Sequence, residues 1–206
     1  MKKVFVTILA ASLMLLGTDA FAQLSVNAGY LNSIFKAERA DAFGSNGFYV
    51  GATYNIPVAG GFGIAPGVYY SWISTKGFES GWLGTASGTF TEQAINVPLY
   101  FDYGFNLSRD AKFIIFAGPT AQYGLSSKTK LDVETVLGGI GTVINNYDKN
   151  YDYNRFNVYL GGGVGFQAGS ILITVGYDYG LLNLYKGENA TKAHRSNLKL
   201  GVGFSF

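Results

Sequence analysis

Apolar and polar residues alternate along the last thirteen residues of the chain, from His194 to Phe206. One face of this segment carries Leu198, Leu200, Val202, Phe204 and Phe206. Side chains two positions apart point to the same side of a β-strand, whereas a helix repeats every 3.6 residues. The same alternation recurs in residues 94–106 and 155–167. The pattern predicts an all-β chain whose strands each have one apolar face.

Five further segments with lower contrast between their faces complete a set of eight expected strands. The eight segments are 24–35, 47–57, 62–73, 94–106, 112–125, 155–167, 171–185 and 194–206. Their connections alternate between tight turns and long polar loops. The turns are 58–61, 108–110 and 168–170, and the loops lie near 36–46, 75–88, 126–153 and 186–193. An even strand number with this alternation predicts an eight-stranded antiparallel up-and-down transmembrane β-barrel.

The composition of the two strand faces indicates that the apolar face meets lipid. The polar face is rich in glycine and carries single charges, as the crowded interior of a small barrel requires. Aromatic residues gather near the segment ends, which is typical of the two membrane interfaces. They are Tyr30, Phe48, Tyr54, Phe62, Tyr70, Trp72, Phe105, Phe166 and Phe206. A soluble lipocalin-like barrel would show the same alternation and is the alternative.

The N-terminus has the order of a cleavable signal peptide. Lys2 and Lys3 precede a nearly continuous apolar run to Gly17, and Ala20-Phe21-Ala22 supplies small residues for cleavage. The run is short for a transmembrane anchor. We therefore expect residues 1–22 to be removed and residues 23–206 to form one outer-membrane β-barrel domain. Its short turns and both termini would lie in the periplasm.

The composition excludes several classes of function. Charged residues make up 14% of the chain, compared with about 25% in soluble domains. There is no cysteine, so the chain can form neither a disulfide framework nor a thiolate metal site. Removal of residues 1–22 takes away Lys2, Lys3 and Asp19 and leaves 13 basic and 12 acidic residues, which gives no electrostatic case for binding nucleic acid.

Charged residues on the polar face are the main candidates for a functional site. They are Glu92, Asp102, Lys112, Arg155, Asp178, Arg195 and Lys199. An eight-stranded barrel is barely wide enough for its own side chains, so charges in its lumen must pair. Asp178 and Lys199 fall at similar heights on neighbouring strands, and we expect them to form an ion pair. The network is either a plug of salt bridges, which the narrow lumen favours, or an ion path.

Other candidate residues do not form a catalytic or metal-binding constellation. No Asp or Ser lies at a spacing from His194, the single histidine, that would indicate a catalytic site. A metal site would need more ligands than one His and scattered carboxylates. The glycine-rich run 161–165 lacks the helix and the Lys-Ser/Thr of a phosphate-binding loop. We therefore expect no catalytic residue, metal or cofactor. The longest loop, 126–153, is a candidate site for a protein partner or a surface polymer.

Several stretches resemble the PorT-type outer-membrane β-barrel family, which is close in plan to the OmpA/OmpX-like small barrels. They are INVPLYFDYGF (95–105), FIIFAGPTAQYGL (113–125), VYLGGGVGF (158–166), VGYDYGLLNL (175–184) and LKLGVGFSF (198–206). The resemblance implies insertion by the barrel assembly machinery, which reads a terminal strand that ends in an aromatic residue such as Phe206. The barrel would contact outer-membrane lipid and lipopolysaccharide.

Three functions follow as hypotheses. The first is a structural or interaction barrel that acts through its extracellular loops. The second is a narrow channel for small solutes, and the third is a barrel enzyme that modifies lipid. We favour the first, because a filled lumen argues against a channel and no constellation of residues supports an enzyme.

Overall fold

The computed structural model describes residues 23–206, apart from 39, 82–83, 136–137, 149–152 and 186–191. The expected signal peptide, residues 1–22, lies outside the described residues. Within these ranges no helix is long and apolar enough to span a bilayer. The described chain forms nine strands: β1 (Gln23–Ala37), β2 (Ala40–Ala59), β3 (Phe62–Gly81), β4 (Gly84–Asn106), β5 (Ala111–Thr135), β6 (Gly138–Asn145), β7 (Phe156–Ala168), β8 (Ile171–Gly180) and β9 (Ala193–Ser205).

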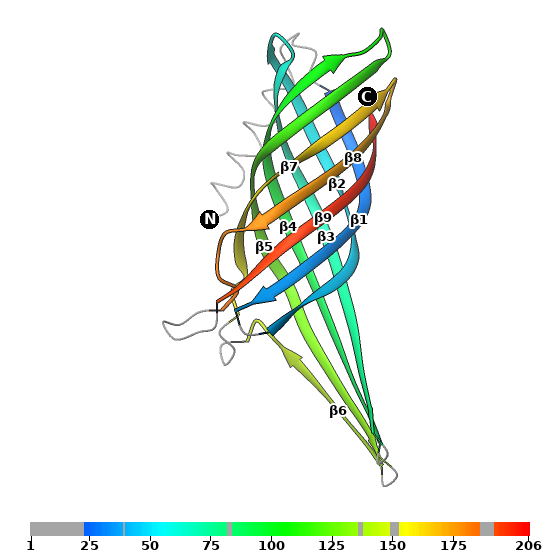
Figure 1. Cartoon of the computed structure of the whole chain (residues 1–206), viewed down its shortest axis with the longest axis vertical. Coiled ribbons are helices and arrows are strands. Elements are labelled where there is room, and N and C mark those ends of the chain that lie inside the picture. The colour runs from blue at the N-terminus through cyan, green and yellow to red at the C-terminus, as the bar shows by residue number, and fades with distance from the viewer. Residues whose placement is uncertain (1–22, 39, 82–83, 136–137, 149–152, 186–191) are drawn as a thin grey trace, which may run out of the picture.

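Eight of these strands close into a ring (Figure 1). The antiparallel pairs run from β1 through β2, β3, β4, β5, β7 and β8 to β9, and β9 pairs again with β1. The ring leaves no sheet edge open along its wall, as a closed barrel requires. The predicted eight-stranded antiparallel up-and-down barrel is therefore confirmed.

The three predicted tight turns lie at one end of the barrel, together with the C-terminus (Figure 1). We call this the turn end and the opposite end the loop end. Gly60, Gly61 and Gly169 have positive φ angles of 59°, 91° and 55°. Residues with a Cβ atom rarely adopt this conformation, so glycine is what allows two of the three turns, 58–61 and 168–170, to be so tight.

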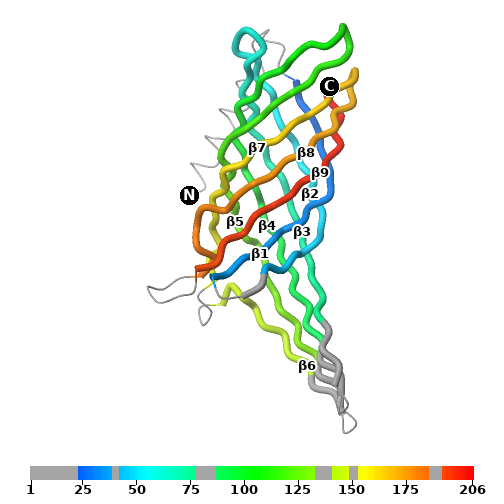
Figure 2. The backbone as a smooth tube through the Cα atoms, viewed as in Figure 1, coloured from blue at the N-terminus to red at the C-terminus, as the bar shows by residue number. Residues whose placement is uncertain are grey.

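The linkers near 36–46, 75–88 and 126–153 were expected to be loops, and this is wrong for most of each. β1 runs to Ala37 and β2 begins at Ala40. β3 and β4 continue in register to the pair Gly81–Gly84, and β5 runs on to Thr135. In the part of the chain that the structure describes, β6 pairs only with β5 and lies outside the ring. The four strands β3, β4, β5 and β6 project beyond the loop end as one sheet (Figure 2). A sheet in water can carry polar residues on both faces, which removes the apolar alternation on which the sequence argument depended.

The predicted division into an apolar outer face and a small or polar inner face is also confirmed for much of the ring, whereas large apolar residues such as Leu31 and Ile73 point inward near the loop end. In β9 the alternate residues Leu198, Leu200, Val202 and Phe204 are exposed, whereas Arg195, Asn197, Gly203 and Ser205 are buried. Large exposed apolar side chains recur on all eight strands of the ring. A continuous apolar surface of this kind suits lipid rather than water.

Candidate functional site

An ion pair between Arg195 and Glu92 crosses the lumen near the loop end. Arg195 belongs to β9 and Glu92 to β4, and these strands are opposite one another in the ring. Arg195 Nη1 lies 2.6 Å from Glu92 Oε1, and Nη2 lies 2.8 Å from Oε2. Both side chains are buried, at 2% and 3% exposure. This two-bond geometry is the strong form of a charge-assisted hydrogen bond, and we call the pair the loop-end bridge.

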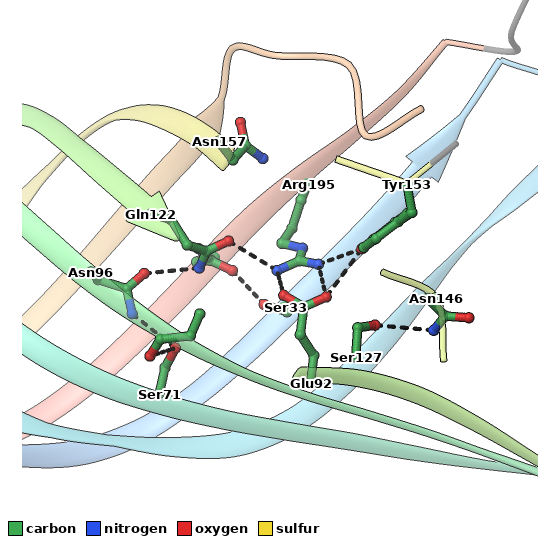
Figure 3. Close-up of polar contacts among 12 residues, drawn as sticks. Ser33, Ser71, Glu92, Asn96, Gln122, Ser127, Asn146, Tyr153, Asn157 and Arg195 are labelled. Carbon is green, nitrogen blue, oxygen red and sulfur yellow. Dashed lines mark hydrogen bonds and ion pairs between the residues drawn. The ribbon is translucent and has the colours of Figure 1, made fainter. Parts of the chain in front are cut away.

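Hydrogen bonds extend the loop-end bridge into a network (Figure 3). Arg195 Nη2 donates to the Tyr153 hydroxyl at 2.7 Å, and that hydroxyl donates to Glu92 Oε2 at 3.2 Å. Burial raises the pKa of Tyr153 well above its usual value, so its hydroxyl stays protonated. Arg195 Nη1 also donates to Gln122 Oε1 at 3.2 Å. The two charges are therefore stabilised by neutral partners as well as by each other.

The network continues along the wall of the barrel and includes an aromatic cover. The Gln122 amide donates to Asn96 at 2.8 Å, and the Asn96 amide donates to Ser71 at 2.8 Å. The Arg195 guanidinium lies 4.5 Å from the centre of the Phe35 ring. Phe35 belongs to an apolar cluster at this end, which includes Leu31, Ile73, Tyr147, Tyr153 and Leu184. Packed apolar and polar side chains together fill the lumen at the level of the loop-end bridge.

The predicted ion pair between Asp178 and Lys199 is present. Lys199 Nζ lies 2.6 Å from Asp178 Oδ2. Lys199 Nζ also donates to the Tyr100 hydroxyl at 2.8 Å. Tyr100 is on β4 and Lys199 on β9, so this contact crosses the lumen between the same two opposite strands as the loop-end bridge. We call the contact between Lys199 and Tyr100 the middle bridge.

Two more of the predicted lumen charges lie toward the turn end. Asp102 is buried and accepts a hydrogen bond from the Asn55 amide at 2.6 Å. Lys112 is half-buried, and its aliphatic chain lies across Gly104. Both residues line the hollow at the mouth of the barrel.

Arg155 is the one predicted lumen charge that the structure places elsewhere. Its side chain is exposed, lies 4.7 Å from the centre of the Tyr147 ring and donates to the Tyr147 carbonyl at 3.3 Å. The prediction was wrong because β7 begins at Phe156. The alternation that sends Asn157 and Tyr159 into the lumen therefore does not extend back to Arg155.

His194 and Phe206 lie at opposite ends of β9 and outside the lumen network. The His194 ring stacks on Tyr179 with 6.0 Å between centroids, and its Nδ1 lies 3.1 Å from the Gly180 carbonyl oxygen. Phe206 is 72% exposed and packs against Phe204. Among the described residues, no three His, Asp or Glu side chains gather closely enough to hold a metal ion.

A cavity of about 140 Å³ occupies the lumen on the turn-end side of the loop-end bridge. Its wall includes Asp178 and Lys199 and the apolar residues Ile114 and Phe116. A lumen filled along its whole length was expected from its narrow diameter. The structure limits the filling to the loop end, because small residues such as Gly165 and Gly176 line the wall nearer the turns.

Sequence reasoning missed several members of the lumen network. Asn96 and Tyr100 are on the polar face that the period-two pattern predicts for residues 94–106, and Gln122 alternates with outward residues in the same way, but being uncharged they were not singled out as candidates. Tyr153 carries no such signal, because it lies between strands and reaches the lumen only through an isolated bridge with Tyr185.

The projecting sheet is the second candidate site, and we define it as residues 75–81, 84–91, 128–135 and 138–145. Ser127 is buried against the lumen opposite Glu92, so the alternation puts the exposed Lys128 on the other, outer face. Lys130 follows on that face. Lys76 joins them, because both Lys76 and Lys130 pair with Thr89 of β4. Three exposed lysines therefore share the outer face just beyond the ring.

Comparison with known proteins identifies the kind of barrel. The family model described as outer membrane protein beta-barrel domain matches residues 18–186. None of the curated protein sequences that were compared matches the chain. The solved structure of Ail from Yersinia pestis is 16% identical, covers 90% of this chain and 99% of its own, and has a TM-score of 0.50. Ail in complex with the heparin analogue sucrose octasulfate is 15% identical with the same coverage and a TM-score of 0.52.

Neisserial surface protein A is also similar, at 16% identity over 89% of this chain and 97% of its own, with a TM-score of 0.44. Because the identities are low, the similarity to the Ail structures is evidence for the fold alone. That similarity agrees with the ring of strands described above. The narrower likeness to the PorT type stays a prediction. The family model covers most of the sequence and matches the observed architecture. The chain therefore belongs to the outer membrane protein beta-barrel domain family, and its place is the outer membrane.

Proposed function

We propose that this protein is an interaction protein of the outer membrane, in which the barrel is the anchor and the projecting sheet binds anionic saccharides. The continuation of four strands beyond the ring carries the proposal (Figure 1). β5 is 25 residues long, whereas a strand needs about 9–11 residues to cross a bilayer. Its pairing with β7 ends at Tyr123, and residues 128–135 of the strand belong to the projecting sheet.

The ligand class follows from the outer face of that sheet. Lys76, Lys128 and Lys130 are exposed there and lie in two adjacent cross-strand rows. Neighbours within and between such rows are about 5–7 Å apart, which suits a ligand with several negative groups. Asp132 lies on the same face, so the four residues carry a net charge of +2.

The position of the lysines points to the membrane surface. Tyr123 and Leu125 precede them on β5 and are exposed to the lipid side, at 51% and 45%. The lysines follow within a few residues, at the level expected for head groups. The phosphates of lipopolysaccharide and the acidic groups of a glycan from outside the cell share the chemistry that this face would bind. Ail has been solved with a sulfated sugar, but the low identity means that our proposal rests on this chain's own lysines.

The orientation and export of the chain belong to the same proposal. The loop end would face outward, and the short turns and both termini would face the periplasm. Residues 1–22 would be removed as a signal peptide, and the barrel assembly machinery would read Phe206. The lumen charges would then act as a plug, since the loop-end bridge and its apolar cover close the outward side.

A narrow channel is the second candidate, and the cavity below the loop-end bridge is the observation that favours it. A solute would still have to pass a bidentate ion pair whose members are both nearly inaccessible to solvent. The remaining hypothesis, an enzyme acting on lipid, has no observation of this kind in its favour. The described neighbours of His194 are an aromatic ring and a backbone carbonyl, and neither would activate a nucleophile.

Binding of two anionic probes tests the proposed function. The refolded protein is titrated with lipopolysaccharide-containing liposomes and with soluble heparin, and phosphatidylcholine liposomes and dextran are the uncharged controls. A variant with Lys76→Gln, Lys128→Gln and Lys130→Gln should bind at least about tenfold more weakly. The matched control is Lys36→Gln, Arg109→Gln and Lys192→Gln, which removes three exposed charges outside the projecting sheet.

The two probes also separate the two possible sources of the ligand. If the Lys76, Lys128 and Lys130 variant loses binding to lipopolysaccharide alone, the ligand is the lipid of the protein's own leaflet. If it loses binding to heparin alone, the ligand is a glycan from outside. An equal loss of probe binding in both triple variants, or no loss of binding in either, would refute a binding face on the projecting sheet.

A further inference from the structure

The cavity in the lumen is a closed-ended pocket. Two bridges cross the lumen from β9 to β4, and the loop-end bridge closes the outer side of the cavity. A second hollow lies at the turn end and shares Asn55, Asp102 and Lys112 with the wall of the first. The shared residues connect the cavity to the turn end, so small molecules would enter from that side.

The charges around this pocket are balanced. Asp178 and Lys199 form an ion pair, and Asp102 is hydrogen-bonded to Asn55 with Lys112 on the same wall. The formal charges of these two carboxylates and two ammonium groups sum to zero. Burying an unpaired ion here would be costly, so the pocket favours an uncharged occupant over an ion.

The rest of the wall offers hydroxyl and amide groups next to aromatic rings. Asn27, Thr53, Thr174 and Asn197 contribute polar groups, and Tyr49 and Tyr69 contribute ring surface. Hydroxyl groups of a ligand both donate and accept hydrogen bonds, which matches this mixed wall. The C–H faces of such a ligand would pack on the tyrosine rings.

One side chain at the closed end has an unused hydrogen-bonding group. Thr120 is 4% exposed and lines the cavity two residues from Gln122, which belongs to the loop-end network. Its hydroxyl has no hydrogen-bond partner among the described residues. A buried polar group without a partner is destabilising, and a bound hydroxyl group would satisfy it.

We propose that the lumen pocket binds a small, uncharged, polyhydroxylated molecule of about the size of a monosaccharide. A volume of about 140 Å³ holds roughly ten water molecules at 10–15 Å³ each, which matches a single sugar ring better than an oligosaccharide. This site is separate from the cationic face of the projecting sheet, so either proposal can fail without the other.

Saturation-transfer NMR with the refolded protein tests the pocket. The probes are glucose and N-acetylglucosamine, with glucosamine and glucuronate as charged analogues of similar size. Thr120→Val keeps the shape of the side chain and removes the hydroxyl, and it should weaken binding of the neutral sugars about fivefold. Ala65→Leu adds bulk to the wall of the cavity and should weaken binding at least about tenfold.

Ala117→Leu is the matched control, because it adds the same bulk to the exposed outer face of β5. Heat-modifiable gel mobility checks that each variant is folded. Binding of neutral sugars that is weakened by Ala65→Leu and unchanged by Ala117→Leu supports the pocket. Absence of neutral-sugar binding, a preference for either charged analogue, or equal effects of the two leucine variants overturns it.

Discussion

Arg195 on β9 and Glu92 on β4 contact each other across the full width of the barrel through two hydrogen bonds, of 2.6 and 2.8 Å. Neighbouring strands of the ring are held by their backbones, but these two strands are not neighbours. The side-chain pair therefore joins opposite walls directly. It also places two charges where almost no solvent reaches, so each depends on the other for its stability.

Removal of one partner of the loop-end bridge should destabilise the barrel strongly. Glu92→Ala leaves the Arg195 guanidinium buried without its counter-ion, and we expect a loss of about 3–5 kcal/mol in the free energy of unfolding. Urea unfolding in phospholipid vesicles, followed by tryptophan fluorescence, measures the loss. The double variant Glu92→Leu with Arg195→Met should recover most of it, because no charge is left unpaired. A loss below about 1 kcal/mol in the single variant would mean that water reaches the bridge.

Two glycines, Gly47 in the wall of the ring and Gly77 in the projecting sheet, should respond differently to an added methyl group. A Cβ atom at Gly47 would overlap the carbonyl oxygen of Trp72 on the neighbouring strand, which cannot move without disturbing the sheet. A Cβ atom at Gly77 would meet nothing within 4 Å. We expect Gly47→Ala to cost about 1–3 kcal/mol in the unfolding experiment and Gly77→Ala to cost little. Similar values for the two variants would contradict the close packing of β2 against β3.

The C-terminal aromatic residue should matter for assembly more than for stability. Among the described residues Phe206 is the most exposed of the large apolar side chains, so Phe206→Ala removes little packing. We expect this variant to refold in detergent like the wild type but to reach the outer membrane in reduced amounts in cells. Phe204→Ala, two residues earlier on the same lipid-facing side, is the control. Equal insertion of Phe206→Ala and wild type would remove the proposed role of Phe206 as an assembly signal.

The sequence predicts the ring well because lipid imposes a strict rule on it. Positions that face the hydrocarbon of the membrane must be apolar, as the alternate residues from Leu198 to Phe204 of β9 are, so the alternation identifies both the strands and their inner faces. The ion pair of Asp178 and Lys199 follows from that alternation, since both residues lie well inside regular strands. Arg155 fails for the complementary reason, because it lies one residue before β7 begins.

The projecting sheet and the pocket could not be predicted by that rule. Beyond the ring both faces of the sheet can be polar, so residues such as Thr89, Lys128 and Thr142 carry no alternation of apolar and polar positions. The loop-end network depends on Tyr153, which reaches the lumen from outside any strand. The cavity depends on how side chains from several strands fill a shared volume, and no single strand encodes that.

Conductance of the refolded wild-type protein in a planar lipid bilayer tests the central claim most directly. The claim is that the barrel is an anchor closed at the loop end by Arg195, Glu92 and their apolar cover. It predicts a membrane that stays electrically silent while gel mobility of the same preparation shows folded barrel. A steady conductance that changes with Glu92→Ala would show instead that the lumen is a pore, with the loop-end bridge as part of its path.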